Sequence, residues 1–170
     1  METAMRVSPG RAATAAAAVL VAVLLQGTLL ARLPLPGGSP NLVVVLVLAV
    51  GLAAGAPAGM STGFAAGLLA DLLSDHPVGL LALCFAVAGF VVGLLETDAE
   101  RSVLWPLLIV GVGAAGTFLL YLGLLAVLGR PSASGLGDLP STVVYDVMLT
   151  PFVVPVVAAV TRRLDADTLR

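Results

Sequence analysis

The sequence has no lysine, one cysteine, one histidine, and few charged or aromatic residues. Charged residues make up 11% and aromatic residues 5% of its 170 residues, whereas an ordinary soluble domain is about 25% charged. Hydrophobic residues make up 59%, and the mean hydropathy is +1.12. A soluble fold of this size could not cover so much apolar surface with so few polar residues. The composition therefore excludes a soluble domain and predicts an integral membrane protein.

The same shortages exclude several kinds of site. The eight cations are all arginine and are scattered along the chain, which argues against the clustered basic face that nucleic acids need. Cys84 alone cannot form an intramolecular disulfide or a cysteine-based metal site, and His76 lies in a polar turn. The sequence contains no HExxH motif, no phosphate-binding loop and no GxGxxG motif. We therefore expect no enzyme activity, no cofactor and no metal site.

Six stretches are predicted to be membrane-spanning helices. The stretch from Asn41 to Leu73 would be about 50 Å long as one helix, too long for a hydrocarbon core of about 30 Å. Pro57, near its middle, breaks the hydrogen-bond ladder or begins a new helix. We therefore predict an all-α, polytopic membrane protein with a single transmembrane domain over residues 1–170. Its predicted spans are residues 12–31, 41–55, 57–73, 78–95, 105–128 and 141–161.

The arginines predict the orientation of these spans. Arg6 and Arg11 precede the first span, so that segment resembles a secretory signal, but the runs after it favour an uncleaved helix. With six spans and a cytoplasmic N-terminus, six arginines lie inside and two, Arg32 and Arg130, lie outside. With five spans the split becomes three inside and five outside, against the positive-inside rule. We therefore predict six spans, with both termini in the cytoplasm.

Glycines recur every four residues in the second and third spans. Small residues at this spacing let two helix backbones approach closely, which matters in lipid because no hydrophobic force drives helices together. We therefore predict that these glycines pack helices, either within this chain or against another protein. The predicted helix-packing glycines are Gly51, Gly55, Gly59, Gly63, Gly67, Gly89 and Gly93.

Polar residues in the spans are predicted to converge on one level in the outer half of the bilayer. Groups at that depth that cannot reach water must turn toward one another. In one interpretation they satisfy each other and the helix ends, with Arg32 or Arg130 as counter-ion. In the other they line an outward-facing cleft for a ligand or a partner's segment. The candidate residues are Gln26, Arg32, Asn41, Asp71, Tyr145 and Asp146.

Several short motifs resemble those of the rod shape-determining protein MreD family. They cover about a third of the chain, in the order and spacing of that family. Phe90 departs from the pattern, since an aromatic hydroxyl is commoner there. The motifs are Pro40-Asn41-Leu42, Gly55-Ala56-Pro57-Ala58-Gly59, the run from Gly63-Phe64 through Gly67-Leu68 to Asp71, Pro77-Val78-Gly79, and Gly89-Phe90.

The resemblance implies a non-enzymatic scaffold of the bacterial cell-elongation machinery in the plasma membrane. Such a protein would sit beside MreC and, through it, MreB, RodA and a penicillin-binding transpeptidase. The family's helical arrangement is thought to be similar to the substrate-binding subunits of energy-coupling-factor vitamin transporters. That similarity supplies an alternative, a small-molecule-binding transporter subunit. Such a subunit needs a pocket with aromatic groups, and only 5% of this chain is aromatic.

Overall fold

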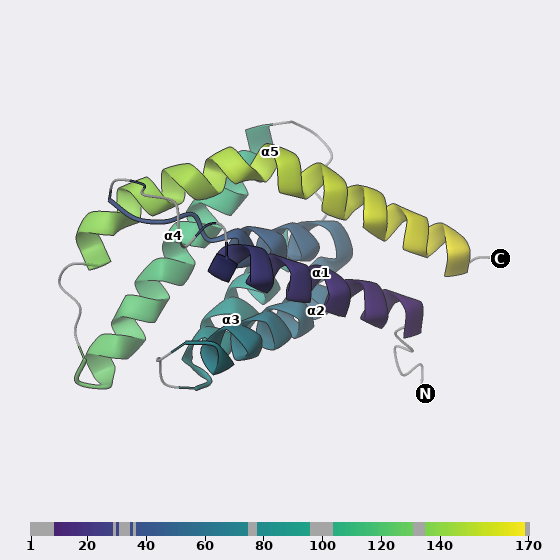
Figure 1. The fold of residues 1–170 in the computed structure, drawn as a ribbon. Coiled ribbons are helices and arrows are strands. Elements are labelled where there is room, and N and C mark those ends of the chain that lie inside the picture. Colours follow the sequence, from purple (N-terminus) through teal and green to yellow (C-terminus); the bar gives the residue numbers. More distant parts are fainter. Residues whose placement is uncertain are drawn as a thin grey trace.

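A computed structural model describes residues 9–28, 30, 35, 37–74, 78–95, 104–130 and 135–168. These residues form five helices and, within the ranges given, no strand. The arrangement is shown in Figure 1, where the first turn of α1 and the last turn of α5 lie at the same end of the molecule. The helices are α1 (Pro9–Thr28), α2 (Leu42–Leu72), α3 (Leu80–Gly93), α4 (Leu104–Val127) and α5 (Gly135–Thr168).

The long helix α2 is bent back on itself at Gly55. The backbone there has φ 81° and ψ 176°, a conformation that glycine adopts at little steric cost. A Cβ built on Gly59 would lie 2.8 Å from the Cα of Gly51, although residues eight apart in a straight helix are about 12 Å apart. Pro57 is the second residue after the break. Proline has no backbone N–H, so the break leaves no unpaired donor at this position. Helix α2 is therefore two antiparallel arms, residues 42–54 and 56–72.

The first arm of α2 lies at the centre of the bundle. Helix α2 packs against each of α1, α3, α4 and α5. Its first arm is a continuous apolar run, and Val45, Val47 and Leu48 are at most 1% exposed. A helix that is apolar on every side belongs where every side is covered. The hydrophobic core therefore surrounds this arm, with contributions from α1, α3 and α4.

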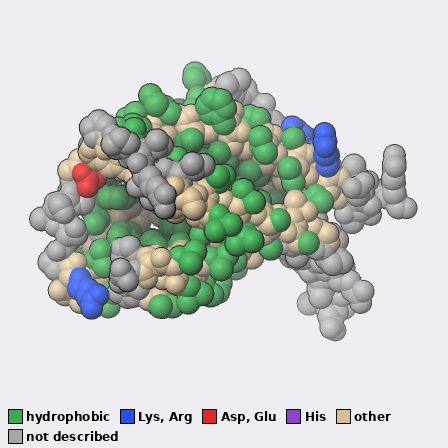
Figure 2. Space-filling view, viewed as in Figure 1, with side chains coloured by type: hydrophobic (Ala, Val, Ile, Leu, Met, Phe, Trp, Pro, Cys, Tyr) green, Lys and Arg blue, Asp and Glu red, His purple; other side chains and the backbone are tan. Residues whose placement is uncertain are grey.

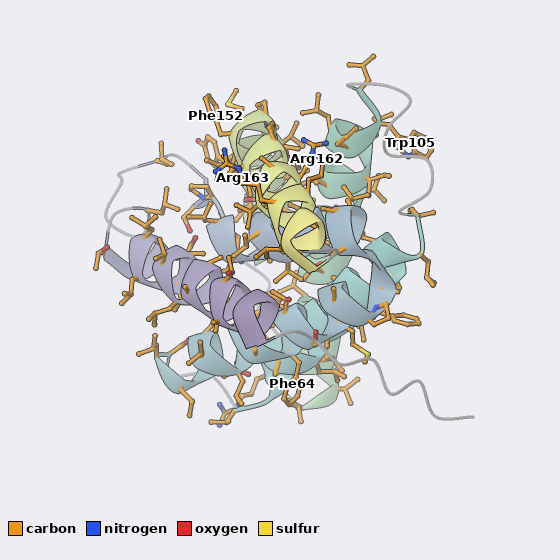
Figure 3. The ribbon with its side chains drawn as sticks, turned by 90° about the vertical axis from the view of Figure 1, so that its right-hand side faces the viewer. Phe64, Trp105, Phe152, Arg162 and Arg163 are labelled. Carbon is orange, nitrogen blue, oxygen red and sulfur yellow. The ribbon has the colours of Figure 1, made fainter. Side chains whose placement is uncertain are left out.

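The outer helices present apolar side chains to their surroundings. Phe64, Trp105 and Phe152 point away from the bundle in Figure 3, and Phe152 is 73% exposed. Figure 2 shows a mostly hydrophobic face on which the coloured charged side chains lie at the two ends. Among the described residues, three helices are long and apolar enough to cross a membrane by length and composition alone, namely Leu42–Leu72, which is bent at Gly55, Leu104–Val127 and Leu136–Leu164. Ala13–Thr28 and Leu80–Gly93 are shorter apolar helices.

Helix α5 begins earlier than its predicted span. The predicted span begins at residue 141, but residues 135–140 are already helical and Pro140 lies inside α5. A proline near the start of a helix removes only one backbone hydrogen bond. The hydroxyl of Ser141 also donates to the carbonyl of Asp138 at 2.9 Å, so this first stretch has side-chain support.

Candidate functional site

The side chain of Gln26 joins the end of α1 to the start of α2. Its Nε2 donates to the carbonyl of Pro40 at 2.8 Å, and its Oε1 accepts from the backbone N–H of Leu42 at 2.8 Å. The first N–H groups of a helix have no partner within the helix. Gln26 therefore supplies an acceptor that α2 needs, and it does so from a neighbouring helix.

Asn41 and Asp146 complete this junction from α2 and α5. Asn41 is the N-cap of α2, and its side-chain oxygen accepts from the N–H of Val44 at 3.2 Å. The backbone N–H of Asn41 donates to Oδ1 of Asp146 at 2.6 Å. Asp146 is 2% exposed, so its carboxyl group is removed from water and held against the N-terminus of α2. A carboxylate is favoured there by the helix dipole.

Asp71 makes a separate junction between α2 and α3. Its Oδ2 accepts from the N–H of Gly79 at 2.8 Å and of Ala82 at 3.2 Å. Its Oδ1 accepts from the N–H of Leu81 at 3.2 Å. The N-cap residue of α3 is Gly79, with φ 97° and no side chain to offer. Asp71, which is 1% exposed, therefore takes the place of an N-cap side chain from the adjacent arm.

The predicted polar residues thus fall into two groups in the structure. Gln26, Asn41 and Asp146 meet at the start of α2, while Asp71 binds the backbone of α3. Tyr145 is half-buried and precedes Asp146 on α5. Arg32, the proposed counter-ion, lies outside the described residues. In both groups the polar side chains contact backbone groups at helix ends.

The glycines of α2 lie against the backbone of α3. A Cβ built on Gly51 would lie 2.7 Å from the carbonyl oxygen of Gly89, and one on Gly59 would lie 2.8 Å from the carbonyl carbon of Gly89. Since Gly59 also meets Gly51, both arms of α2 and α3 converge on one point. Further along, Gly63 and Gly67 face Phe85 and Ala82, and Gly93 faces Gly55 and Ala56. Real Cβ atoms do not approach so closely, so the junction requires glycine.

Two threonines on α5 belong to this site and were not predicted. Thr142, Asp146 and Thr150 recur every four residues and are at most 8% exposed, so the buried face of α5 is polar. The hydroxyl of Thr150 donates to the carbonyl of Asp146 at 2.9 Å. The hydroxyl of Ser141 lies 2.5 Å from the carbonyl oxygen of Gly37 and 2.9 Å from that of Asp138, so these two carbonyls share its one hydrogen. The four-residue spacing of polar residues in an apolar helix is the signal that could have identified this face.

The buried carboxyl groups of this site bind backbone groups at helix ends. Within the described ranges, no three His, Cys, Asp or Glu side chains lie close enough together to hold a metal ion. The two buried carboxyl groups, on Asp71 and Asp146, accept hydrogen bonds from backbone N–H groups of neighbouring helices. Cys84 is fully buried on α3. The two carboxyl groups therefore hold helices together.

The fold and these junctions define an all-helical membrane protein whose buried polar groups join helix ends. The sequence profile of the family described as rod shape-determining protein MreD matches residues 12–157, and the chain belongs to this family. It is accordingly a membrane component of the rod-shape system, in a family that determines cell shape and is not a known enzyme family. Its three long apolar helices fit a multi-pass plasma-membrane protein. No curated protein and no solved structure matches the chain.

Proposed function

We propose that this protein is a non-enzymatic scaffold of the bacterial rod complex that binds MreC in the plane of the membrane. Through MreC it would support MreB, RodA and a penicillin-binding transpeptidase in peptidoglycan synthesis. The observation that carries the proposal is the use of Asp71 and Asp146, which each accept hydrogen bonds from helix-end N–H groups. Buried ionisable groups in a membrane are costly and mark function by default. Here they support a fixed helix arrangement, as a scaffold requires.

The proposed topology has six spans, with both termini in the cytoplasm. The break at Gly55 supports counting the two arms of α2 separately. Helix α1 begins, and helix α5 ends, at the same end of the molecule (Figure 1). Arg162 and Arg163, near the end of α5, are exposed and suit the cytoplasmic interface. We also infer that the six segments have an arrangement similar to the substrate-binding subunits of energy-coupling-factor transporters.

Cysteine labelling in intact cells tests this topology. We expect cysteines introduced as Glu2→Cys or Thr168→Cys to stay unlabelled by a membrane-impermeant reagent, because both positions would face the cytoplasm. Ser39→Cys is the positive control, since Ser39 is exposed in the segment between α1 and α2. The native Cys84 is fully buried and should not react. Labelling of position 2 or 168 before cell lysis contradicts the six-span topology.

Loss of the protein tests the proposed function. We expect deletion to produce rounded or widened cells while the enzymatic activities of isolated membranes remain. Tagged protein from native membranes is expected to retain MreC, and reintroducing the wild-type chain should restore cell shape. Unchanged cell shape together with no captured MreC would contradict the scaffold. A vitamin that raises the Tm of the purified protein would favour the alternative, a transporter subunit.

A further inference from the structure

The flank of the protein formed by the second arm of α2 and by α3, called the α2–α3 flank, is short compared with a bilayer. The arms of α2, residues 42–54 and 56–72, are about 20 Å and about 26 Å long. Helix α3 has 14 residues, or about 21 Å. The hydrocarbon core of a bilayer is about 30 Å thick. None of these three helical segments alone therefore spans a bilayer of ordinary thickness.

Polar groups mark the limits of this flank at both ends. At one end Asn41 caps α2 and Asp71 caps α3, and Asp75 and His76 follow in the sequence. At the other end Gly93 packs against the turn at Gly55. Only two residues separate Gly93 from a charged segment, which begins at Glu96. The apolar stretch between these polar limits, residues 78–95, would be about 27 Å long if it were helical throughout.

Helix α4, which packs against α3, is longer than this flank. Helix α4 has 24 residues, or about 36 Å, and it runs obliquely to α1 and α5 in Figure 1. A long helix fits a bilayer by tilting, whereas a short helix cannot be lengthened. The side chains on the outside of the short flank are apolar, with Phe64 54%, Leu83 50% and Val91 51% exposed. In the proposed topology these side chains would face acyl chains, so the mismatch at this flank would fall on the lipid.

The free-energy costs of burying charge and of thinning the bilayer decide how the mismatch is accommodated. Four of the six residues from Glu96 to Arg101 are charged, and drawing each charge into the hydrocarbon would cost up to about 2.5–3.5 kcal/mol, the value at the centre of the bilayer. Thinning the bilayer costs only a fraction of a kcal/mol per Å of mismatch. We propose that the α2–α3 flank thins the bilayer beside it and prefers lipids with short or disordered acyl chains. This inference rests on the proposed six-span topology, and it adds a lipid preference that would place the protein in thinner membrane.

Depth measurements on single labels test the thinning. Nitroxides at Leu73→Cys and Leu94→Cys, in a Cys84→Ala background, mark the two ends of the flank, where the native side chains are 72% and 63% exposed. In dioleoyl phosphatidylcholine vesicles we expect both labels at headgroup depth, on opposite faces. Labels at Leu104 and Val127 mark the ends of α4 as controls. If the two flank labels lie on opposite faces but either one lies well within the acyl-chain region, the thinning is refuted and the six-span topology stands.

Two further outcomes separate the hypotheses. Flank labels on the same face of the bilayer would refute the six-span topology and the thinning with it. In vesicles of dimyristoleoyl, dioleoyl and dierucoyl phosphatidylcholine, we expect Tm to fall as the acyl chains lengthen, because the mismatch at the flank grows. A Tm that rises with chain length, or does not change, contradicts the lipid preference.

Discussion

Replacing Gly59 with alanine is expected to lower the free energy of unfolding by about 3 kcal/mol or more. The added methyl group would lie 2.8 Å from the Cα of Gly51 and 2.8 Å from the carbonyl carbon of Gly89. Both obstacles are backbone atoms, so no side chain can turn aside. The two arms of α2 and α3 would have to separate, which would loosen the centre of the bundle.

The matched control is Gly116→Ala on α4. Gly116 also lies in an apolar helix, but a Cβ there would meet nothing within 4 Å. Alanine is the better helix former by about 1 kcal/mol, so this variant should be as stable as the wild type or more so. Unfolding by SDS in mixed micelles, followed by circular dichroism, measures both changes. Equal stability of the Gly59→Ala protein and the wild type would contradict the tight junction.

Replacing Asp71 with leucine is expected to cost about 3 kcal/mol or more. The change leaves the N–H groups of Gly79, Leu81 and Ala82 without the acceptor that they now share. Each buried donor left unpaired costs about 1–3 kcal/mol. Leucine also removes the carboxyl group from the N-terminus of α3, where the helix dipole favours an acidic side chain. The first turn of α3 should fray, and its packing against the second arm of α2 should weaken.

Asp71→Asn separates hydrogen bonding from charge. An asparagine oxygen in the place of Oδ2 can still accept from Gly79 and Ala82, but its NH₂ group would face the N–H of Leu81. We therefore expect a milder loss of about 1–2 kcal/mol. Asp138→Asn is the control, since that carboxylate is exposed in the first turn of α5, and it should change stability little. Hydrogen exchange at the start of α3 measures the fraying, and equal protection in all three variants would count against the capping role.

A different pattern would indicate docking at Asp71. If Asp71→Asn folds and inserts normally but captures less MreC from native membranes, the carboxylate contacts a partner in addition to α3. If MreC capture and stability fall in parallel, the loss of capture would instead follow from the weakened packing of α3 against the second arm of α2. The ratio of captured MreC to folded protein therefore distinguishes the two interpretations of the outer polar residues.

Much of this architecture could be predicted from composition and short-range pattern. Apolar runs with few charges identify a membrane protein because only a bilayer accommodates that much apolar surface. A proline in the middle of an overlong apolar run predicts a break, because it cannot donate to the helix ladder. The backbone leaves helical geometry at Gly55, two residues before Pro57. These are local properties, and the chain carries them whatever its tertiary structure.

The partners of the glycines and carboxylates depend on tertiary structure. A four-residue spacing places Gly59, Gly63 and Gly67 on one side of a helix, but it cannot say what lies opposite. Only the folded chain brings Gly51, Gly59 and Gly89 to one point. Likewise, Asp146 bonds to a residue 105 positions away in the sequence, and a buried acid accepts equally well from a side chain or from a helix end. The sequence therefore determined that this is a membrane protein and which faces of its helices carry glycines and polar residues. Tertiary structure decided which of these faces meet, because hydrogen bonds and close backbone contacts depend on position in space.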